Sequence, residues 1–201
     1  MPKSSHLGED EPPHAESFTG LSQRSFGKLV TVLRREGADT VGRGRPWSLP
    51  LEDRTLLVAA YWRTNLTMRQ LALLFGVSKS AADRIIDHLG PMIALRPRRS
   101  FDKGTVLIVD GTLVPTRDHT IADGGYPGTG LVMPHRRRKA EELPDGKEAH
   151  NKSHKQVRAR VEHVFARMKN WKILRDCRLK GDGVHHAMLG IARLHNLNLS
   201  G

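Results

Sequence analysis

Three acidic residues in the second half of the chain occupy positions from which carboxylates could act together. Asp110 follows the short apolar run 105–109, and Asp123 ends a second short run and precedes two glycines. Both patterns are typical of strands, and carboxylates at the ends of strands are displayed at the carboxyl edge of a sheet. Glu162 lies among apolar residues in a segment with helical periodicity. The chemistry open to such a group of carboxylates is the binding of a hard cation such as Mg²⁺.

A helix predicted over about 153–169 positions Glu162 and two basic residues. Arg158, Glu162 and Lys169 stand at spacings of four and seven, which places them on one helical face, while the apolar residues of the segment form another. Taken alone, this row is better explained as a surface ladder in which Arg158 pairs with Glu162. A second helix, predicted over about 183–197, closes the chain.

The composition favours a polyanionic partner. The 201 residues include 33 Lys and Arg against 21 Asp and Glu, giving a formal charge of +12 and a pI near 10.4. Nucleic acid is the default partner for such a chain. The single cysteine, Cys177, excludes an intrachain disulfide and a cysteine-built zinc site. No apolar run approaches the ~20 residues of a membrane span, so we expect a soluble intracellular protein with no membrane partner.

The pattern along the chain predicts two units after a polar start. Residues 1–17 are expected to be a disordered lead-in, 18–95 a helical DNA-binding domain, and 101–201 a second domain that begins with strands. In the first unit, Ser22 should cap a helix that ends near Gly37, and Pro50 should open a helix that runs through Arg63.

A helix-turn-helix is predicted at 67–89. Thr67 should cap a short first helix, Gly76 should permit the positive φ of the turn, and Ser78 should cap a second helix that ends near Leu89, before Gly-Pro. Small and apolar residues stand where two helices that cross at a steep angle need them: Leu71, Ala72, Phe75, Val77, Ala82 and Ile85.

The second of these helices is a candidate for the major groove of DNA. Lys79, Ser80 and Arg84 are the best candidates for base or phosphate contacts. The alternative is a plain helical hairpin with a solvated charged face, which the basic charge of the whole chain makes the weaker explanation. Arg43 and Arg45 in the preceding linker could enter an adjacent minor groove, although a solvated linker is the simpler interpretation.

The acidic segments resemble a known family. Asp110 in Leu-Ile-Val-Asp-Gly-Thr, Asp123 in Ile-Ala-Asp-Gly-Gly-Tyr, and the spacing Arg158-x3-Glu162-x6-Lys169 are similar to the three acidic motifs of bacterial insertion-sequence DDE transposases. The resemblance covers nearly the whole chain and implies a catalytic domain like ribonuclease H after the DNA-binding helices. It also implies that the two aspartates and the glutamate are catalytic and hold two Mg²⁺ or Mn²⁺ ions, while Arg158 and Lys169 steady DNA phosphates.

The chain departs from this family in two places. Lys155 stands where a tyrosine is usual, three residues before the arginine of the third motif. Asp123 follows Asp110 by only 13 positions, where the family has a long stretch with more strands and a helix. A crossover between parallel strands needs about a dozen residues or more, so the usual site geometry is not expected within one chain unless a tight hairpin pairs the two strands.

The predicted fold class is therefore a mainly α helix-turn-helix domain followed by a truncated ribonuclease-H-like α/β domain. The resemblance implies binding to double-stranded DNA at the inverted-repeat ends of an element, with metal-dependent strand cleavage and transfer that the shortening impairs. The first alternative is a non-catalytic DNA-binding remnant or regulator of a full-length relative, and the second is an unrelated regulator whose acids are structural. A homo-oligomer is left open, and the place of action would be the bacterial cytoplasm, at the nucleoid.

Overall fold

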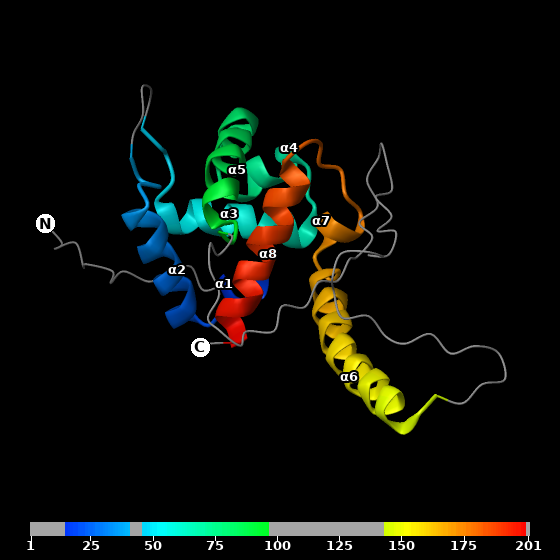
Figure 1. Cartoon of the computed structure of the whole chain (residues 1–201). Helices are drawn as coiled ribbons and strands as arrows, with labels where there is room; N and C mark the ends of the chain where they lie inside the picture. Colours follow the sequence, from blue (N-terminus) through cyan, green and yellow to red (C-terminus); the bar gives the residue numbers. More distant parts are fainter. Residues whose placement is uncertain (1–14, 41–45, 97–142, 200–201) are drawn as a thin grey trace, which may run out of the picture.

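Eight helices make up the parts of the chain that the structure, a computed structural model, describes, which are residues 15–40, 46–96 and 143–199 (Figure 1). In chain order they are α1 (Ala15–Thr19), α2 (Gln23–Arg35), α3 (Leu51–Thr64), α4 (Met68–Leu74), α5 (Lys79–Ile93), α6 (Asp145–Met168), α7 (Lys172–Arg175) and α8 (Gly183–Leu199). The prediction of a mainly helical first half is confirmed. The strands predicted around Asp110 and Asp123 lie outside the described residues. Helix α1 includes the last three residues of the segment predicted as a lead-in.

The three predicted N-caps are confirmed. Ser22 Oγ accepts a hydrogen bond from the backbone N–H of Ser25 at the start of α2. Thr67 begins α4 with a reciprocal capping box with Gln70, and Ser78 Oγ accepts from the backbone N–H of Ala81 in α5 at 3.1 Å. These bonds satisfy amide groups that a helix start leaves without a partner.

The turn between α4 and α5 forms as the sequence predicts. Gly76 has a φ of +63°, a conformation that favours glycine. The small core behind the turn contains Leu71, Ala82 and Ile85, each at most 1% exposed. Helices α4 and α5 thus form the predicted helix-turn-helix.

Helix α5 is longer than predicted. It continues through Gly90 and Pro91 to Ile93 instead of ending near Leu89. Leu89 and Ile93 are both buried, and the backbone N–H of Ala94 still bonds to the carbonyl oxygen of Gly90. Burial of this extra turn outweighs the local helix-breaking tendency of Gly-Pro, which is why the local signal was misleading.

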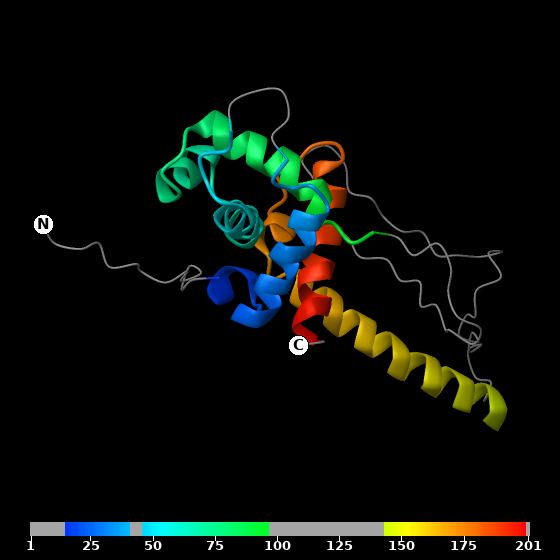
Figure 2. The same ribbon diagram turned by 90° about the vertical axis from the view of Figure 1, so that its left-hand side faces the viewer.

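The C-terminal helices α7 and α8 share one hydrophobic core with the N-terminal helices. Helix α8 packs against α5 and crosses α3, where its Gly190 faces the ring of Trp62 (Figures 1 and 2). The backbone N–H of Leu95 bonds to the carbonyl oxygen of Leu189, and Arg193 Nη1 donates to the carbonyl oxygen of Met92 at 3.0 Å. Segments that we assigned to the second domain are therefore part of the body that holds the helix-turn-helix.

Helix α6 projects away from this core (Figure 2). Only its last turn is firmly anchored, through buried Met168 and the following Trp171, while Val164 is 36% exposed. It begins at Asp145, eight residues before the predicted start. Among the described residues, no helix combines the length and the apolar character that a membrane span requires.

Candidate nucleic-acid interface

Helix α5 presents two charged rows to solvent. Its 15 residues make a rod of about 22 Å, long enough to lie in a major groove. Ser80 and Arg84 are exposed and stand one turn apart, with half-buried His88 a turn further along the same row. The other row begins with exposed Lys79 and continues with the exposed acids Asp83 and Asp87. The three residues predicted to contact DNA are therefore all exposed near the start of one helix.

Trp47 lies beside the first row. Its ring stacks on His88 with centroids 5.3 Å apart and an angle of 30° between the planes. The guanidinium carbon of Arg84 lies over the same ring at 5.8 Å from its centroid, and that of Arg54 at 5.0 Å. We did not predict a role for Trp47. The available signal was an aromatic residue directly after the basic linker, but its contact with α5 depends on the tertiary fold.

The linker residues Arg43 and Arg45 lie outside the described residues. The residues that flank them do contact α5: the carbonyl oxygen of Ala38 lies 3.3 Å from His88 Nε2, and Trp47 stacks on the same imidazole. Ala38 before the linker and Trp47 after it thus contact the same imidazole of α5.

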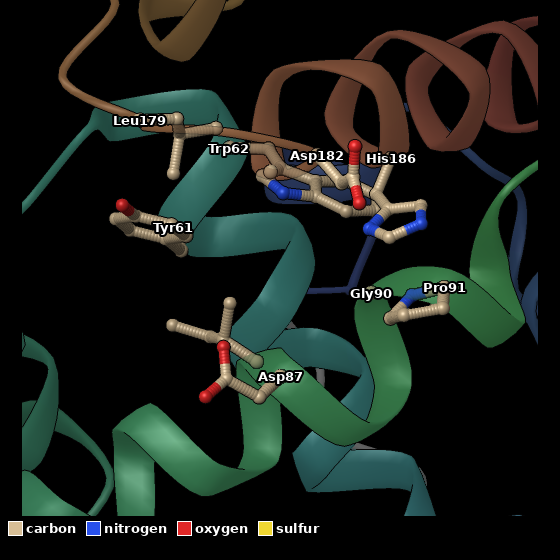
Figure 3. Close-up of a pocket in the computed structure, with 10 residues that line it drawn as sticks. Tyr61, Trp62, Asp87, Gly90, Pro91, Leu179, Asp182 and His186 are labelled. Carbon is tan, nitrogen blue, oxygen red and sulfur yellow. The ribbon is translucent and has the colours of Figure 1, made fainter.

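The acidic row of α5 faces a different environment. A pocket of about 310 Å³ opens between α3, α5 and the start of α8 (Figure 3). Asp87 lines one side of it, with Asp182 and His186 on the other. Burial raises the pKa of Tyr61 in this pocket, and nearby Cys177 and the carboxylates of the acidic row raise it further. Because carboxylates repel phosphates, the Arg84 row is the one suited to face DNA.

The candidate catalytic residues are only partly placed. Glu162 is exposed in α6, and exposed Lys169 is its C-cap residue, while Asp110, Asp123 and the side chain of Arg158 lie outside the described residues. Within the described residues no three His, Cys, Asp or Glu side chains gather closely enough to hold a metal ion. A carboxylate such as that of Glu162 is a suitable ligand for Mg²⁺.

The candidate site residues on α5 also lie apart from those on the projecting part of α6. In both views α5 and the projecting part of α6 lie at opposite sides of the molecule (Figures 1 and 2). One helix therefore presents the exposed row of Ser80 and Arg84, and the other carries basic residues and Glu162 at a distance from that row.

Family models match both halves of the chain. Residues 47–99 match the family described as the helix-turn-helix of DDE superfamily endonucleases, and residues 98–196 match the DDE superfamily endonuclease family. The chain is 64% identical over 248 residues to a protein of Streptomyces albus G named as a transposase for insertion sequence element IS112, covering 95% of this chain and 97% of the relative.

A second relative, from Microchaete diplosiphon, is named as a transposase for insertion sequence element IS702. It is 32% identical over 69 residues, which is 34% of this chain and 25% of the relative. No solved structure matches the chain. The alignment with the Streptomyces protein is 47 positions longer than the 201 residues of this chain, so the relative has positions with no counterpart here. The resemblance to insertion-sequence DDE transposases is thereby confirmed: the chain belongs to the insertion-sequence transposases of the DDE superfamily, with a helix-turn-helix ahead of the endonuclease domain.

Proposed function

We propose that this chain binds double-stranded DNA at the inverted-repeat ends of its element through helix α5. The observation that carries this proposal is the exposed row of Ser80 and Arg84, with Lys79 beside it, at the start of a helix that follows a well-capped turn. The formal charge of +12 adds a general attraction for phosphates. In this arrangement Arg84 reads a base edge, while Lys79 and Ser80 contact a base or the neighbouring backbone.

Replacement of Arg84 by alanine tests this interface. We expect Arg84→Ala to weaken binding to a duplex with the element's end by about 1 to 3 kcal/mol, because a bidentate contact with a base is lost. Fluorescence anisotropy at one fixed salt concentration measures the change. Arg24, an exposed arginine on α2, provides the matched control: Arg24→Ala removes the same charge and should have a much smaller effect. Unchanged affinity in Arg84→Ala would count against the role of α5.

For the second half of the chain, we propose a shortened domain like ribonuclease H in which Asp110, Asp123 and Glu162 are the catalytic acids. Endonucleases of this superfamily generally use divalent metal ions. Here the three carboxylates would hold two Mg²⁺ or Mn²⁺ ions, which activate the attacking oxygen and stabilise the leaving oxygen of a phosphodiester. Arg158 and Lys169 would bind DNA phosphates near the scissile bond, and Arg43 and Arg45 would contact the minor groove beside α5.

Strand cleavage on supercoiled DNA that carries the element's ends tests the catalytic part. We expect weak cleavage that needs Mg²⁺ or Mn²⁺ and is lost in Glu162→Gln, since the amide is a poorer ligand than the carboxylate. Glu148→Gln is the matched control, because Glu148 is also an exposed glutamate on α6 and has no place among the acidic motifs. Glu148→Gln should cleave like the unaltered chain, and equal cleavage by Glu162→Gln would remove Glu162 from the site.

A non-catalytic DNA-binding remnant is the second candidate function. Two observations favour it: the separation of only 13 positions between Asp110 and Asp123, and the longer alignment with the Streptomyces relative, whose extra positions would hold the missing strands. Such a remnant would occupy the same inverted repeats, alone or mixed with copies of a full-length relative. Binding without any metal-dependent cleavage in the assay above would select this candidate.

A further inference from the structure

Trp47 lies at the centre of a cluster on the edge of α5. Its half-buried ring contacts three side chains that can carry positive charge: Arg54, Arg84 and His88. An aromatic ring attracts cations over its face, and the attraction is worth about 0.5 to 1 kcal/mol at exposed sites. Arg84 is exposed, so without Trp47 its long side chain would sample many rotamers.

The groups behind Trp47 are held firmly. Arg54 is 1% exposed and donates to the carbonyl oxygens of Leu49 at 3.1 Å and Ala38 at 3.0 Å. His88 is half-buried and lies near the same Ala38 carbonyl oxygen. The indole ring is thus supported by side chains whose own positions are restricted, and it can act as a fixed surface for Arg84.

We propose that Trp47 is a positioning residue that orients Arg84 for bidentate contact with a guanine in the major groove. A guanidinium over an aromatic face keeps its N–H donors directed outward in the plane of the group. Those donors match the O6 and N7 acceptors of guanine. The inference rests on the proposed binding of DNA through α5, and it adds the base class that Arg84 reads and the residue that directs it.

This arrangement should affect specificity more than overall affinity. A base contact depends on the direction of the guanidinium fork, whereas attraction to phosphates depends mainly on charge, which Trp47 does not carry. When the side chain is oriented before binding, less conformational entropy is lost on forming the base contact. Loss of Trp47 should therefore weaken binding to the preferred duplex and leave binding to unrelated duplexes nearly unchanged.

The test uses the full chain and two duplexes. One is selected by the unaltered chain from a library of random sequence, and the other has the same composition in scrambled order. We expect Trp47→Leu to lower the affinity for the selected duplex about two- to fivefold, with little change for the scrambled one. Trp47→Phe keeps an aromatic face and should retain most of the specific affinity. Trp47→Met, a second replacement without a ring, is measured alongside so that the result does not depend on the folding of one variant.

A double-mutant cycle separates positioning from a general effect on the fold. In the background of Arg84→Ala, Trp47→Leu should cause no further loss for the selected duplex. Arg63 provides a matched control, because its guanidinium carbon lies 5.0 Å from the centroid of a different ring, that of Trp171. Arg63→Ala removes a contact of the same kind and should leave the ratio of the two affinities unchanged.

The outcomes distinguish the two proposals. If Arg84→Ala leaves binding to the selected duplex unchanged, the proposed role of α5 fails, and the role of Trp47 fails with it. If Arg84→Ala weakens binding but the ring-free variants of Trp47 do not, or if their effect persists without Arg84, only the positioning role is overturned. A guanine in the selected duplex whose replacement by adenine abolishes the effect of Trp47→Leu would support the assignment of the base.

Discussion

A chain with Gly190→Ala should unfold about 10 °C below the unaltered chain, or fail to fold. Gly190 is a buried residue of α8, and a Cβ atom at this position would overlap the indole ring of Trp62. Trp62 is 2% exposed, and a Cβ atom at Gly90 of α5 would also lie only 3.9 Å from its ring, so the ring has little room to move. Overpacking of this kind costs about 3 kcal/mol where neighbours cannot relax. Thermal unfolding followed by far-UV circular dichroism measures the shift.

Gly146 provides the control for this prediction. It lies near the start of α6, is exposed, and an added Cβ would meet no atom within 4 Å. Gly146→Ala should therefore leave stability unchanged or raise it by up to about 1 kcal/mol, because alanine has the higher helix propensity. A similar loss of stability in both variants would show that close packing of α8 on Trp62 is not the cause. An unaffected Gly190→Ala would show that α8 does not pack on α3 as described.

The parts of the fold that depend on neighbouring residues in the chain could be predicted from the sequence. The caps at Ser22, Thr67 and Ser78 depend on atoms within a few residues, and a local pattern was enough to predict them. The same local reasoning failed at Gly90 and Pro91, where burial of Ile93 extends α5. Local signals therefore predicted these three capped starts but not the end of α5.

The C-terminal helices show a second limit of prediction from the sequence. The apolar stripe of α8 was visible in the sequence, but a stripe does not identify the surface that covers it. The expectation of a separate second domain assigned that stripe to a sheet, whereas Ile191 and Leu194 are buried in the core shared with α3 and α5. The four-residue helix α7 was too short for its periodicity to be recognised, and Pro144 before α6 was an unused start signal.

The candidate site also has some features that could be predicted from local spacing and others that depend on the tertiary fold. The exposure of Lys79, Ser80 and Arg84 follows from helical spacing, because the apolar face of α5 is fixed by its neighbours in sequence. The contact of Trp47 with Arg84 joins residues that are far apart in the chain, and no spacing rule indicates it. The acidic motifs were recognised by order and spacing alone, which indicates the family but not whether the carboxylates meet.

Replacement of Arg54 by methionine should destabilise the fold by about 3 kcal/mol. Arg54 is buried, forms an ion pair with Asp39, and donates to the carbonyl oxygens of Ala38 and Leu49. Burial lowers the pKa of its guanidinium, and the neighbouring Asp39 opposes that shift. Methionine fills a similar length but offers no donor, so the two carbonyl oxygens would lose their charged partner. Denaturation in urea at neutral pH measures the loss.

Arg34 gives a matched comparison because it contacts the same carboxylate. It pairs with Asp39 at 3.3 Å and with Glu52 at 2.6 Å, but its side chain is 51% exposed. Water screens an exposed pair, so Arg34→Met should cost less than about 1 kcal/mol. Equal losses for the two variants would mean that Asp39, and not the buried carbonyl oxygens, accounts for the contribution of Arg54.

The same pair of variants links stability to DNA recognition. Arg54 lies 5.0 Å from the centroid of the Trp47 ring and helps to fix that ring beside α5, whereas Arg34 has no contact with it among the described residues. At a temperature where both variants are folded, Arg54→Met should reduce the preference for the selected duplex, and Arg34→Met should not. A preference that survives Arg54→Met would mean that the stacking of Trp47 on His88 is sufficient to position Arg84.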